Sequence, residues 1–331
     1  MGFLHAPEQT GRAPPDAIAF VCGDQRQLGT LSRLLRRAVG RVELTDSLQG
    51  IADLSSYALV AVHYDALSLQ EQEGLLTDFV HRAGRPTLLL LSQRCAERDF
   101  ARLFGSRALT NMLVLNDTGL DVSDLLVTVQ KIRHGEIFGL EKYFVWGVEP
   151  RSVWVGGSDE KYRVLDQITA YASSIGVAAR LRSSIRTVAD EFLANAIYNA
   201  PVDAVGTPRF AQQSRTLPVR LDPGEEIEVR FCCDGRRFGI STVDPFGSLS
   251  PERLQDYLAR AFRRGDDQVN KGDGGAGLGF YQILDALSHF VVNIDRGFRT
   301  EMIGLLDVSG GYRGVASSGK SFNIFVKEHL R

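Results

Sequence analysis

The sequence predicts two α/β units, a doubly wound parallel sheet followed by an α+β unit. Its 331 residues exceed the roughly 100–200 that are typical of one domain. Up to about residue 133, buried apolar runs alternate with helical patterns, which favours a parallel sheet with helices on both faces. Beyond that point an amphipathic helix, a hairpin signal and a glycine-rich loop follow one another.

The apolar runs of the first unit have the length of buried strands, and the stretches between them carry apolar residues at helical spacing. Strands are expected at residues 17–22, 57–62, 86–91 and 112–115. Helices are expected at residues 28–39, 67–83, 96–103 and 122–133. Because this rhythm needs only about 120 residues, the first domain is placed at 16–133, after a tail at 1–15.

Residues 134–150 join the two units. They mix aromatic residues with glycine (HGEIFGLEKYFVWGVEP), unlike a flexible linker, which is rich in Gly and Ser or in Pro. The sequence therefore predicts a packed connector at 134–144 and a second domain at 145–331.

Composition excludes several classes of protein. Hydrophobic residues make up 44% and charged residues 24%, as in ordinary globular chains. The 38 basic and 40 acidic residues give a net charge of -2, so no global charge draws the chain to nucleic acid or to an anionic membrane. No apolar run is long enough to span a bilayer, and the first fifteen residues lack a signal-peptide pattern. A cytoplasmic protein is expected.

The four cysteines, Cys22, Cys95, Cys232 and Cys233, are too few and too irregular for a disulfide framework, and none forms a CxxC pair. Glycine is the one residue type in excess, with 33 residues, and the excess is concentrated toward residue 279.

The order of strands and helices in the first unit resembles the receiver domains of bacterial response regulators. That resemblance implies an acidic pair after the first strand, a phosphorylatable Asp after the third, Ser or Thr after the fourth and Lys after the fifth. The corresponding positions here are Cys22 and Gly23, His63, Ser92 and Asn116. Only Ser92 fits, so a degenerate receiver without a Mg²⁺ cage is expected, used for docking or dimerisation. A shifted site at Asp24 and Asp65, and a structural His63, stay open.

One helix of the second unit carries polar residues at a suggestive spacing. Apolar residues recur at helical spacing through residues 183–199, and Glu191 and Asn195 lie four apart on one face, with Asn199 a turn further on. Taken alone, such a spacing is most often a solvated helix face.

Two strands, at 227–231 and 237–243, joined by Asp234-Gly235, read as a hairpin that ends at Asp244. After a basic stretch, Gly272 to Gly279 (GDGGAGLG) opens another amphipathic helix. Bare backbone N–H groups at a helix start bind anions. No buried strand precedes these glycines and no GK[ST] follows them, which excludes a Rossmann or a Walker A site.

Together these elements resemble the Bergerat ATP-binding fold of histidine kinases, gyrase, chaperone and mismatch-repair ATPases. Glu191 to Ile197 (EFLANAI) matches the N box, Asp244 to Gly247 (DPFG) the first Gly box, and Gly275 to Gly279 (GAGLG) the second. Over residues 145–308 the sequence looks most like anti-sigma-factor serine kinases. The implied fold is an α+β Bergerat-type ATP-binding sandwich.

The resemblance implies a role for each matched residue. Asp244 accepts a hydrogen bond from the exocyclic amine of adenine, Asn195 binds Mg²⁺, and Glu191 orients or deprotonates the attacking hydroxyl. Asn199 and Gly247 complete the ATP-binding set. The phosphates are expected at Gly275, Gly277, Leu278, Gly279 and Lys271, with Arg263 or Arg264 in a lid that closes over the nucleotide.

Two departures leave alternatives open. Phe246 stands where a Gly is expected, so the adenine pocket is altered, and Asn199 stands where the serine kinases often carry His. The loop at 201–224 is longer than usual, and reads equally as a partner-binding element or as a disordered one.

The expected function is Mg²⁺-ATP binding with phosphoryl transfer to Ser or Thr of a signalling partner protein of the anti-sigma-antagonist kind. A non-catalytic nucleotide-dependent switch is the alternative, and plain ATP hydrolysis is a third. No nucleic-acid or membrane partner is expected, and homodimerisation stays open.

Overall fold

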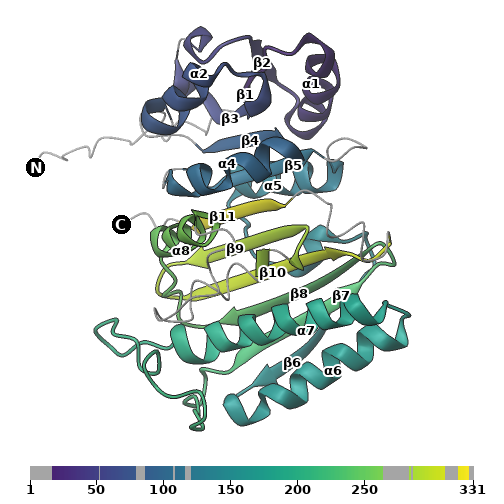
Figure 1. The fold of residues 1–331 in the computed structure, drawn as a ribbon, viewed down its shortest axis with the longest axis vertical. Helices are drawn as coiled ribbons and strands as arrows, with labels where there is room; N and C mark the ends of the chain where they lie inside the picture. Colours follow the sequence, from purple (N-terminus) through teal and green to yellow (C-terminus); the bar gives the residue numbers. More distant parts are fainter. Residues whose placement is uncertain are drawn as a thin grey trace, which may run out of the picture.

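The computed structural model describes residues 17–51, 53–79, 86–106, 109–115, 121–263, 283–284, 286–309 and 320–327. The chain is a mixed α/β protein built on one sheet of eleven strands (Figure 1). The strand order is β2-β1-β3-β4-β5-β11-β9-β10-β8-β7-β6. Residues 17–134 contribute five neighbouring strands at one end of the sheet and are called the first half. Residues 151–327 contribute the other six and are called the second half.

The first half is a parallel sheet with helices on both faces, as the alternating pattern predicts. Its strands are β1 (Ala17–Val21), β2 (Val42–Thr45), β3 (Tyr57–His63), β4 (Thr87–Ser92) and β5 (Asn111–Leu115). Its helices are α1 (Gln25–Val39), α2 (Leu69–Gly74), α4 (Gln93–Gly105) and α5 (Val122–His134). Neighbouring strands are parallel. The helices α1 and α5 cover one face and α2 and α4 the other. The strand order 2-1-3-4-5 is common among doubly wound sheets.

The prediction from sequence missed one strand of this half, β2. Of its four residues only Val42 is buried, because β2 lies at the edge of the sheet. An edge strand that alternates polar and apolar residues over so short a stretch has no apolar run to reveal it.

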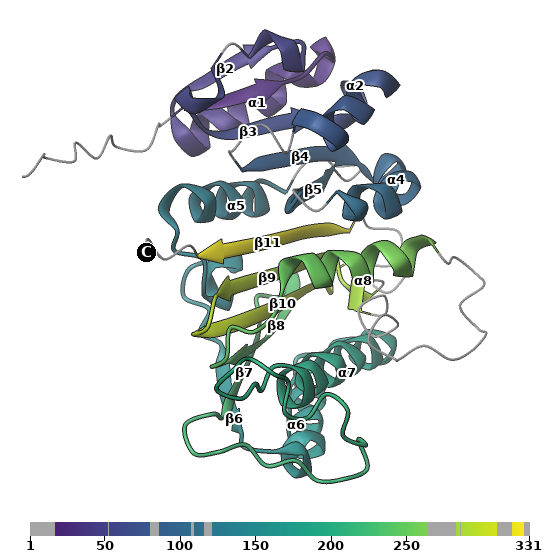
Figure 2. The same ribbon diagram turned by 90° about the vertical axis from the view of Figure 1, so that its left-hand side faces the viewer.

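The second half is mainly antiparallel. Its strands are β6 (Arg151–Val155), β7 (Ile227–Cys233), β8 (Arg237–Asp244), β9 (His289–Asp295), β10 (Arg299–Asp307) and β11 (Ser321–Lys327). Among the strand pairs that the described residues of this half form, β9 with β11 is parallel and the others are antiparallel. The helices α6 (Lys161–Ser174), α7 (Ala179–Ala194) and α8 (Pro251–Arg263) pack on one face of the sheet, as Figures 1 and 2 show.

The connector is packed, as predicted, and it lies on the face of the second half opposite to α6, α7 and α8. Ile137, Leu140 and Tyr143 are buried there against Ile303 and Phe325 of the sheet. Each contributes apolar area removed from water, which accounts for the aromatic composition of this segment.

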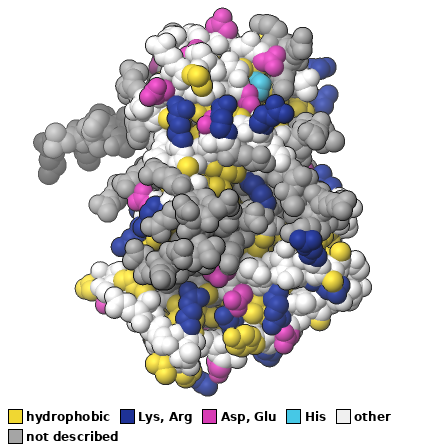
Figure 3. All heavy atoms as spheres, in the orientation of Figure 1, with side chains coloured by type: hydrophobic (Ala, Val, Ile, Leu, Met, Phe, Trp, Pro, Cys, Tyr) yellow, Lys and Arg dark blue, Asp and Glu magenta, His cyan; other side chains and the backbone are white. Residues whose placement is uncertain are grey.

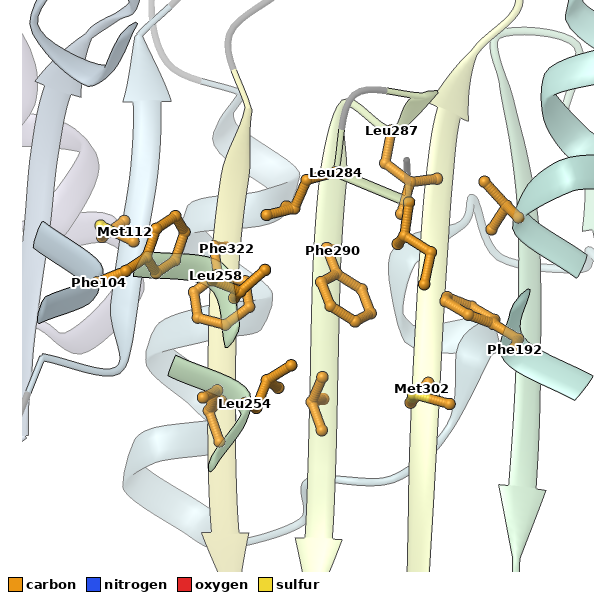
Figure 4. Packing of buried hydrophobic residues seen from close by; sticks show 14 of the residues in the cluster. Phe104, Met112, Phe192, Leu254, Leu258, Leu284, Leu287, Phe290, Met302 and Phe322 are labelled. Atoms are coloured by element: carbon orange, nitrogen blue, oxygen red, sulfur yellow. The ribbon is translucent and has the colours of Figure 1, made fainter. Parts of the chain in front are cut away.

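The two halves share one sheet, and one hydrophobic cluster contains residues of both. Strand β11 lies between β5 and β9 and pairs with β5 through Phe322 opposite Met112. The ring of Phe104 packs edge-on against Phe322, with 5.0 Å between the centroids. Phe262 of α8 stacks on Phe104 at 5.6 Å. Figure 4 shows side chains of both halves meeting over this part of the sheet. The first half is therefore part of the platform on which α8 rests.

A chain of buried polar side chains also crosses the join. The Arg237 guanidinium donates to both oxygens of Asp124, at 2.7 and 3.2 Å. His289 Nδ1 lies 3.1 Å from Asp124, and its Nε2 is 2.6 Å from the amide oxygen of Asn323. Burial alone raises the pKa of Asp124, but the charges and hydrogen bonds of His289 and Arg237 outweigh it and lower that pKa. Breaking a buried ion pair by removing one partner is costly. These polar contacts therefore favour one fixed arrangement of the two halves.

None of the described helices combines the length and the apolar character needed to cross a membrane.

Candidate functional site

The helix that carries Glu191 ends in an irregular turn. The apolar stripe of α7 packs on the sheet, where Ile185, Val188 and Phe192 are fully buried. The next residues, Asn195–Asn199, form a π-helical turn in which the Ala200 N–H donates to the Asn195 carbonyl at 3.0 Å. Such wide turns are rare and often occur at functional sites. Here the turn ends the helix beside the end of β8.

Asn195 and Asn199 hold each other in this turn. The Asn195 amide Nδ2 donates to the carbonyl of Glu191 at 2.9 Å. The Asn199 Nδ2 donates to Asn195 Oδ1, also at 2.9 Å. Since an amide oxygen accepts two hydrogen bonds or ligands, Asn195 Oδ1 keeps capacity for one more partner.

Asp244 is the last residue of β8, and its side chain is only 5% exposed. Its Oδ1 accepts hydrogen bonds from the backbone N–H groups of Phe246 at 3.0 Å and Gly247 at 3.3 Å. Burial raises the pKa of Asp244 to about 7, although these hydrogen bonds act in the opposite direction. Burial thus removes the carboxyl group from water and disfavours its charged form, which lowers the stability of the folded chain.

Gly247 is a glycine for a backbone reason. Its φ is +58°, and a Cβ there would lie 2.1 Å from the carbonyl oxygen of Asp295. The Gly297 N–H donates to the Gly247 carbonyl at 3.2 Å. The chain after Asp244 therefore packs directly on the turn between β9 and β10, and only glycine permits that approach.

A cavity of about 170 Å³ lies among these segments. Its walls come from the end of α7, the end of β8 and the residues after it, β10, α8 and the 201–224 loop. The described residues that line it are Asn195, Asn199, Ala200, Pro208, Ala211, Asp244, Ser248, Leu249, Ser250, Arg253, Tyr257, Thr300 and Met302. The structure thus brings Asn195, Asn199 and Asp244 together, as the sequence predicts.

The predicted base, Glu191, does not line this cavity. Its side chain is half-buried, and burial raises its pKa, with the charge of Arg215 acting in the opposite direction. The adjacent Asp190 pairs with Lys161 at 2.7 Å. A carboxylate with a raised pKa suits a general base, but here it lies beside the cavity and not in its wall.

Thr300 is the main cavity residue that the sequence did not indicate. Antiparallel pairing of β10 with β8 sets Thr300 directly opposite Asp244. Thr300 is 2% exposed, and both its hydroxyl and its backbone N–H hydrogen-bond to Asp244 and act to lower the pKa of that carboxyl group. Only the register of two strands far apart in sequence places it there, so no local pattern could have identified it. The Thr300 hydroxyl thus lies beside Asp244 in the cavity wall, where a ligand can contact both groups.

The second glycine-rich segment cannot be placed in this site. Lys271, Gly275, Gly277, Leu278 and Gly279 lie outside the described residues, as does Arg264. Arg263 is the last residue of α8, whose residues Arg253 and Tyr257 line the cavity.

In the first half, the polar side chains at or near the expected receiver positions are paired with one another. His63 Nδ1 lies 3.4 Å from Cys22 Sγ, and both side chains are buried. Burial also lowers the pKa of His63. The Asp65 carboxylate accepts the Ser92 N–H at 2.7 Å and the Ser92 hydroxyl at 2.5 Å. The Ser92 oxygen in turn caps α4, accepting from the Cys95 N–H at 3.2 Å.

Among the residues that the structure describes, no three His, Cys, Asp or Glu side chains come together in a way that would hold a metal ion. Asn116, the position expected to replace a receiver lysine, lies outside those residues. The shifted acidic site at Asp24 and Asp65 therefore has no support from a clustered donor set.

Magnesium with a bound nucleotide needs fewer protein ligands. Mg²⁺ keeps several waters and is commonly held by one or two protein oxygens together with substrate phosphates. The remaining capacity of Asn195 Oδ1, at the wall of the cavity, fits that requirement.

In comparisons with family models and with curated proteins, the chain matches none of them.

Proposed function

We propose that this chain binds Mg²⁺-ATP in the cavity between α7, β8 and β10 and transfers its terminal phosphoryl group to Ser or Thr of a partner protein. The observation that carries the proposal is the convergence of Asp244, Thr300 and Asn195 from three separate segments on one cavity. The resemblance of the second half to Bergerat-type kinases supplies the ligand, and that of the first half to receivers supplies the signalling context.

The base end of the nucleotide is assigned to Asp244 and Thr300. A purine with an exocyclic amine offers a donor to the buried carboxylate, and a ring nitrogen offers an acceptor to the Thr300 hydroxyl beside it. Because both groups are buried, hydrogen bonds from them to a ligand are worth more than hydrogen bonds made in water. Leu249 and Met302 supply apolar surface for a flat ring.

The phosphate end is assigned to Asn195 and Asn199. Asn195 Oδ1 would hold the magnesium ion, with Asn199 fixing the orientation of that amide by its hydrogen bond. The ion, when bound, neutralises charge on the triphosphate. Arg253 of α8, also in the wall, adds a positive charge for the same purpose.

One observation favours a second candidate function, a switch that binds nucleotide without catalysis. Glu191 is the proposed base, yet it is absent from the cavity wall. If Glu191 does not reach an attacking hydroxyl, nucleotide occupancy acts on partner docking alone.

Calorimetric titration with Mg²⁺-ATP tests the nucleotide site. Wild type is expected to bind, and Asp244→Asn, which keeps the shape but removes the charge, is expected to bind about 10- to 100-fold more weakly. Asp166→Asn is the matched control, since Asp166 is 72% exposed on α6 and pairs with Arg186. Absence of binding by wild type would sink the proposal.

Transfer of labelled phosphate from ATP to co-purified partner proteins then separates kinase from switch. Glu191→Gln is expected to abolish transfer while leaving ATP affinity within about twofold, since a base acts on the reaction and not on binding. Transfer that continues in this variant contradicts the assignment of the base.

A further inference from the structure

The 201–224 loop is a folded part of the cavity wall. Val202 and Pro208 form an isolated antiparallel bridge, and the Arg209 N–H donates to the Pro201 carbonyl at 2.9 Å. Two of its residues, Pro208 and Ala211, line the cavity. Of the two readings open from sequence, a disordered segment is therefore wrong, because backbone and side-chain contacts hold this loop in place.

Arg209 ties the loop together. Its guanidinium pairs with Asp222 at 2.9 Å, near the far end of the loop, and also with Glu225, just beyond it. Arg209 and Glu225 are 22% and 23% exposed, so this pair is largely shielded from solvent, whereas Asp222 is 73% exposed. Arg209 thus closes the loop by joining its two ends, with Pro208 and Ala211 beside it in sequence.

The same guanidinium reaches the end of the cavity marked by Asp244. It lies 5.8 Å from the centroid of the Phe246 ring, a cation–π distance. Phe246 is buried and donates its backbone N–H to Asp244 Oδ1. Phe246, which stands where the first Gly box has a glycine, is therefore the residue that Arg209 of the loop contacts at this end of the cavity.

We propose that the 201–224 loop is a fixed wall for the nucleoside part of the ligand, and that Arg209 is the residue that positions it. The inference rests on the proposed function, because Asp244 is taken to mark the base end of the nucleotide. Pro208 and Ala211 face the same cavity as Leu249 and Met302, so a flat base lies between apolar surfaces. The site then recognises adenosine, ADP and ATP by one shared contact, independent of the number of phosphates.

The test is calorimetric titration of adenosine, ADP and ATP into wild type, Arg209→Ala, Arg209→Lys and Arg220→Ala. Arg209→Ala is expected to weaken all three ligands by the same factor, about 5- to 20-fold. Arg209→Lys keeps the charge and is expected to recover part of that loss. Arg220 is the matched control, since it lies in the same loop but is 83% exposed and pairs with Asp159, away from the cavity.

Ala211→Leu is a second variant that leaves every ion pair of the loop intact. Ala211 is exposed, so the larger side chain extends the wall into the cavity without loss of a buried contact. All three ligands are expected to bind more weakly to it. This variant keeps the inference testable if Arg209→Ala does not fold.

If Arg209→Ala or Ala211→Leu leaves the affinities unchanged, or weakens ATP alone, the loop is not a wall for the nucleoside, while the proposed function stands. Failure of wild type to bind any of the three ligands overturns both.

Discussion

Asp65 in the first half lies two residues beyond the end of β3, where the receiver resemblance expects its carboxylate at the position of His63. Asp244 in the second half is the last residue of β8, at the position where the Bergerat resemblance expects a carboxylate. Asp65 is exposed, and Ser92 donates to both of its oxygens. Asp244 is buried, its pKa is raised to about 7, and it lies in the wall of the cavity, opposite Thr300. The first carboxylate completes a helix cap, whereas the second is held at a cost that a ligand can offset.

The comparison concerns the polar groups at the two expected sites. At the receiver positions of the first half, Cys22 contacts His63, and Ser92 donates to Asp65. Those groups are engaged with one another and stabilise the fold. At the cavity of the second half, Asn195 Oδ1 accepts one hydrogen bond from the described residues and keeps capacity for a second partner.

The largest expected effect is on the pH dependence of stability. A carboxyl whose pKa is higher in the folded than in the unfolded chain makes the folded state less stable as pH rises from about 4 through 7. Asp244→Asn removes this loss, so at pH 8 the ligand-free variant is expected to exceed wild type by on the order of 3 kcal/mol in free energy of unfolding.

Urea denaturation at pH 5 and at pH 8 measures this difference. The gap between variant and wild type should widen at the higher pH. If the two proteins keep the same gap at both values, Asp244 is not held with a raised pKa, and the contrast with Asp65 disappears.

A smaller effect is expected from Thr300→Val. Removing the hydroxyl takes away one hydrogen bond to the ligand, so ATP affinity should fall about fivefold, and the ligand-free protein should also lose some stability because that hydroxyl hydrogen-bonds to Asp244. Thr242→Val is a matched control: Thr242 is also buried, on β8, but is not among the described residues that line the cavity. Equal affinities for the two variants would remove Thr300 from the site.

The smallest effect is expected in the first half. Ser92→Ala removes the cap of α4 and one donor to Asp65, which should lower the free energy of unfolding by about 1 kcal/mol and leave ATP affinity unchanged. Thermal unfolding and titration of one preparation, with exposed Ser123→Ala as the control, check both statements. A clear loss of ATP affinity would show that the two halves do not differ in the way proposed.

Much of the local structure was predictable. The buried strands of the first half, the helix through residues 183–194 and the hairpin that ends at Asp244 follow from apolar periodicity and from an Asp-Gly turn, which act over neighbouring residues. Asn195 and Asp244 were identified for the same reason, since each lies in a motif a few residues long. Strand β2 was missed because an edge strand has little apolar signal.

The joining of the halves was not predictable from local pattern. Strand β11, from the end of the chain, enters the sheet between β5 and β9, and α8 packs against α4 through Phe262 and Phe104. The contacts of β11 with β5 and of Phe262 with Phe104 link residues more than a hundred positions apart, and their partners are chosen by the whole fold.

The sequence by itself therefore determined the elements, the alternation of the first half and the residues of short motifs, because those depend on side-chain spacing along the chain. Only the tertiary structure decided that Thr300 lies opposite Asp244, that Arg209 seats a long loop on Phe246, and that Glu191 lies beside the cavity and not in its wall. These facts depend on strand register and on burial, and both are set when distant segments pack together.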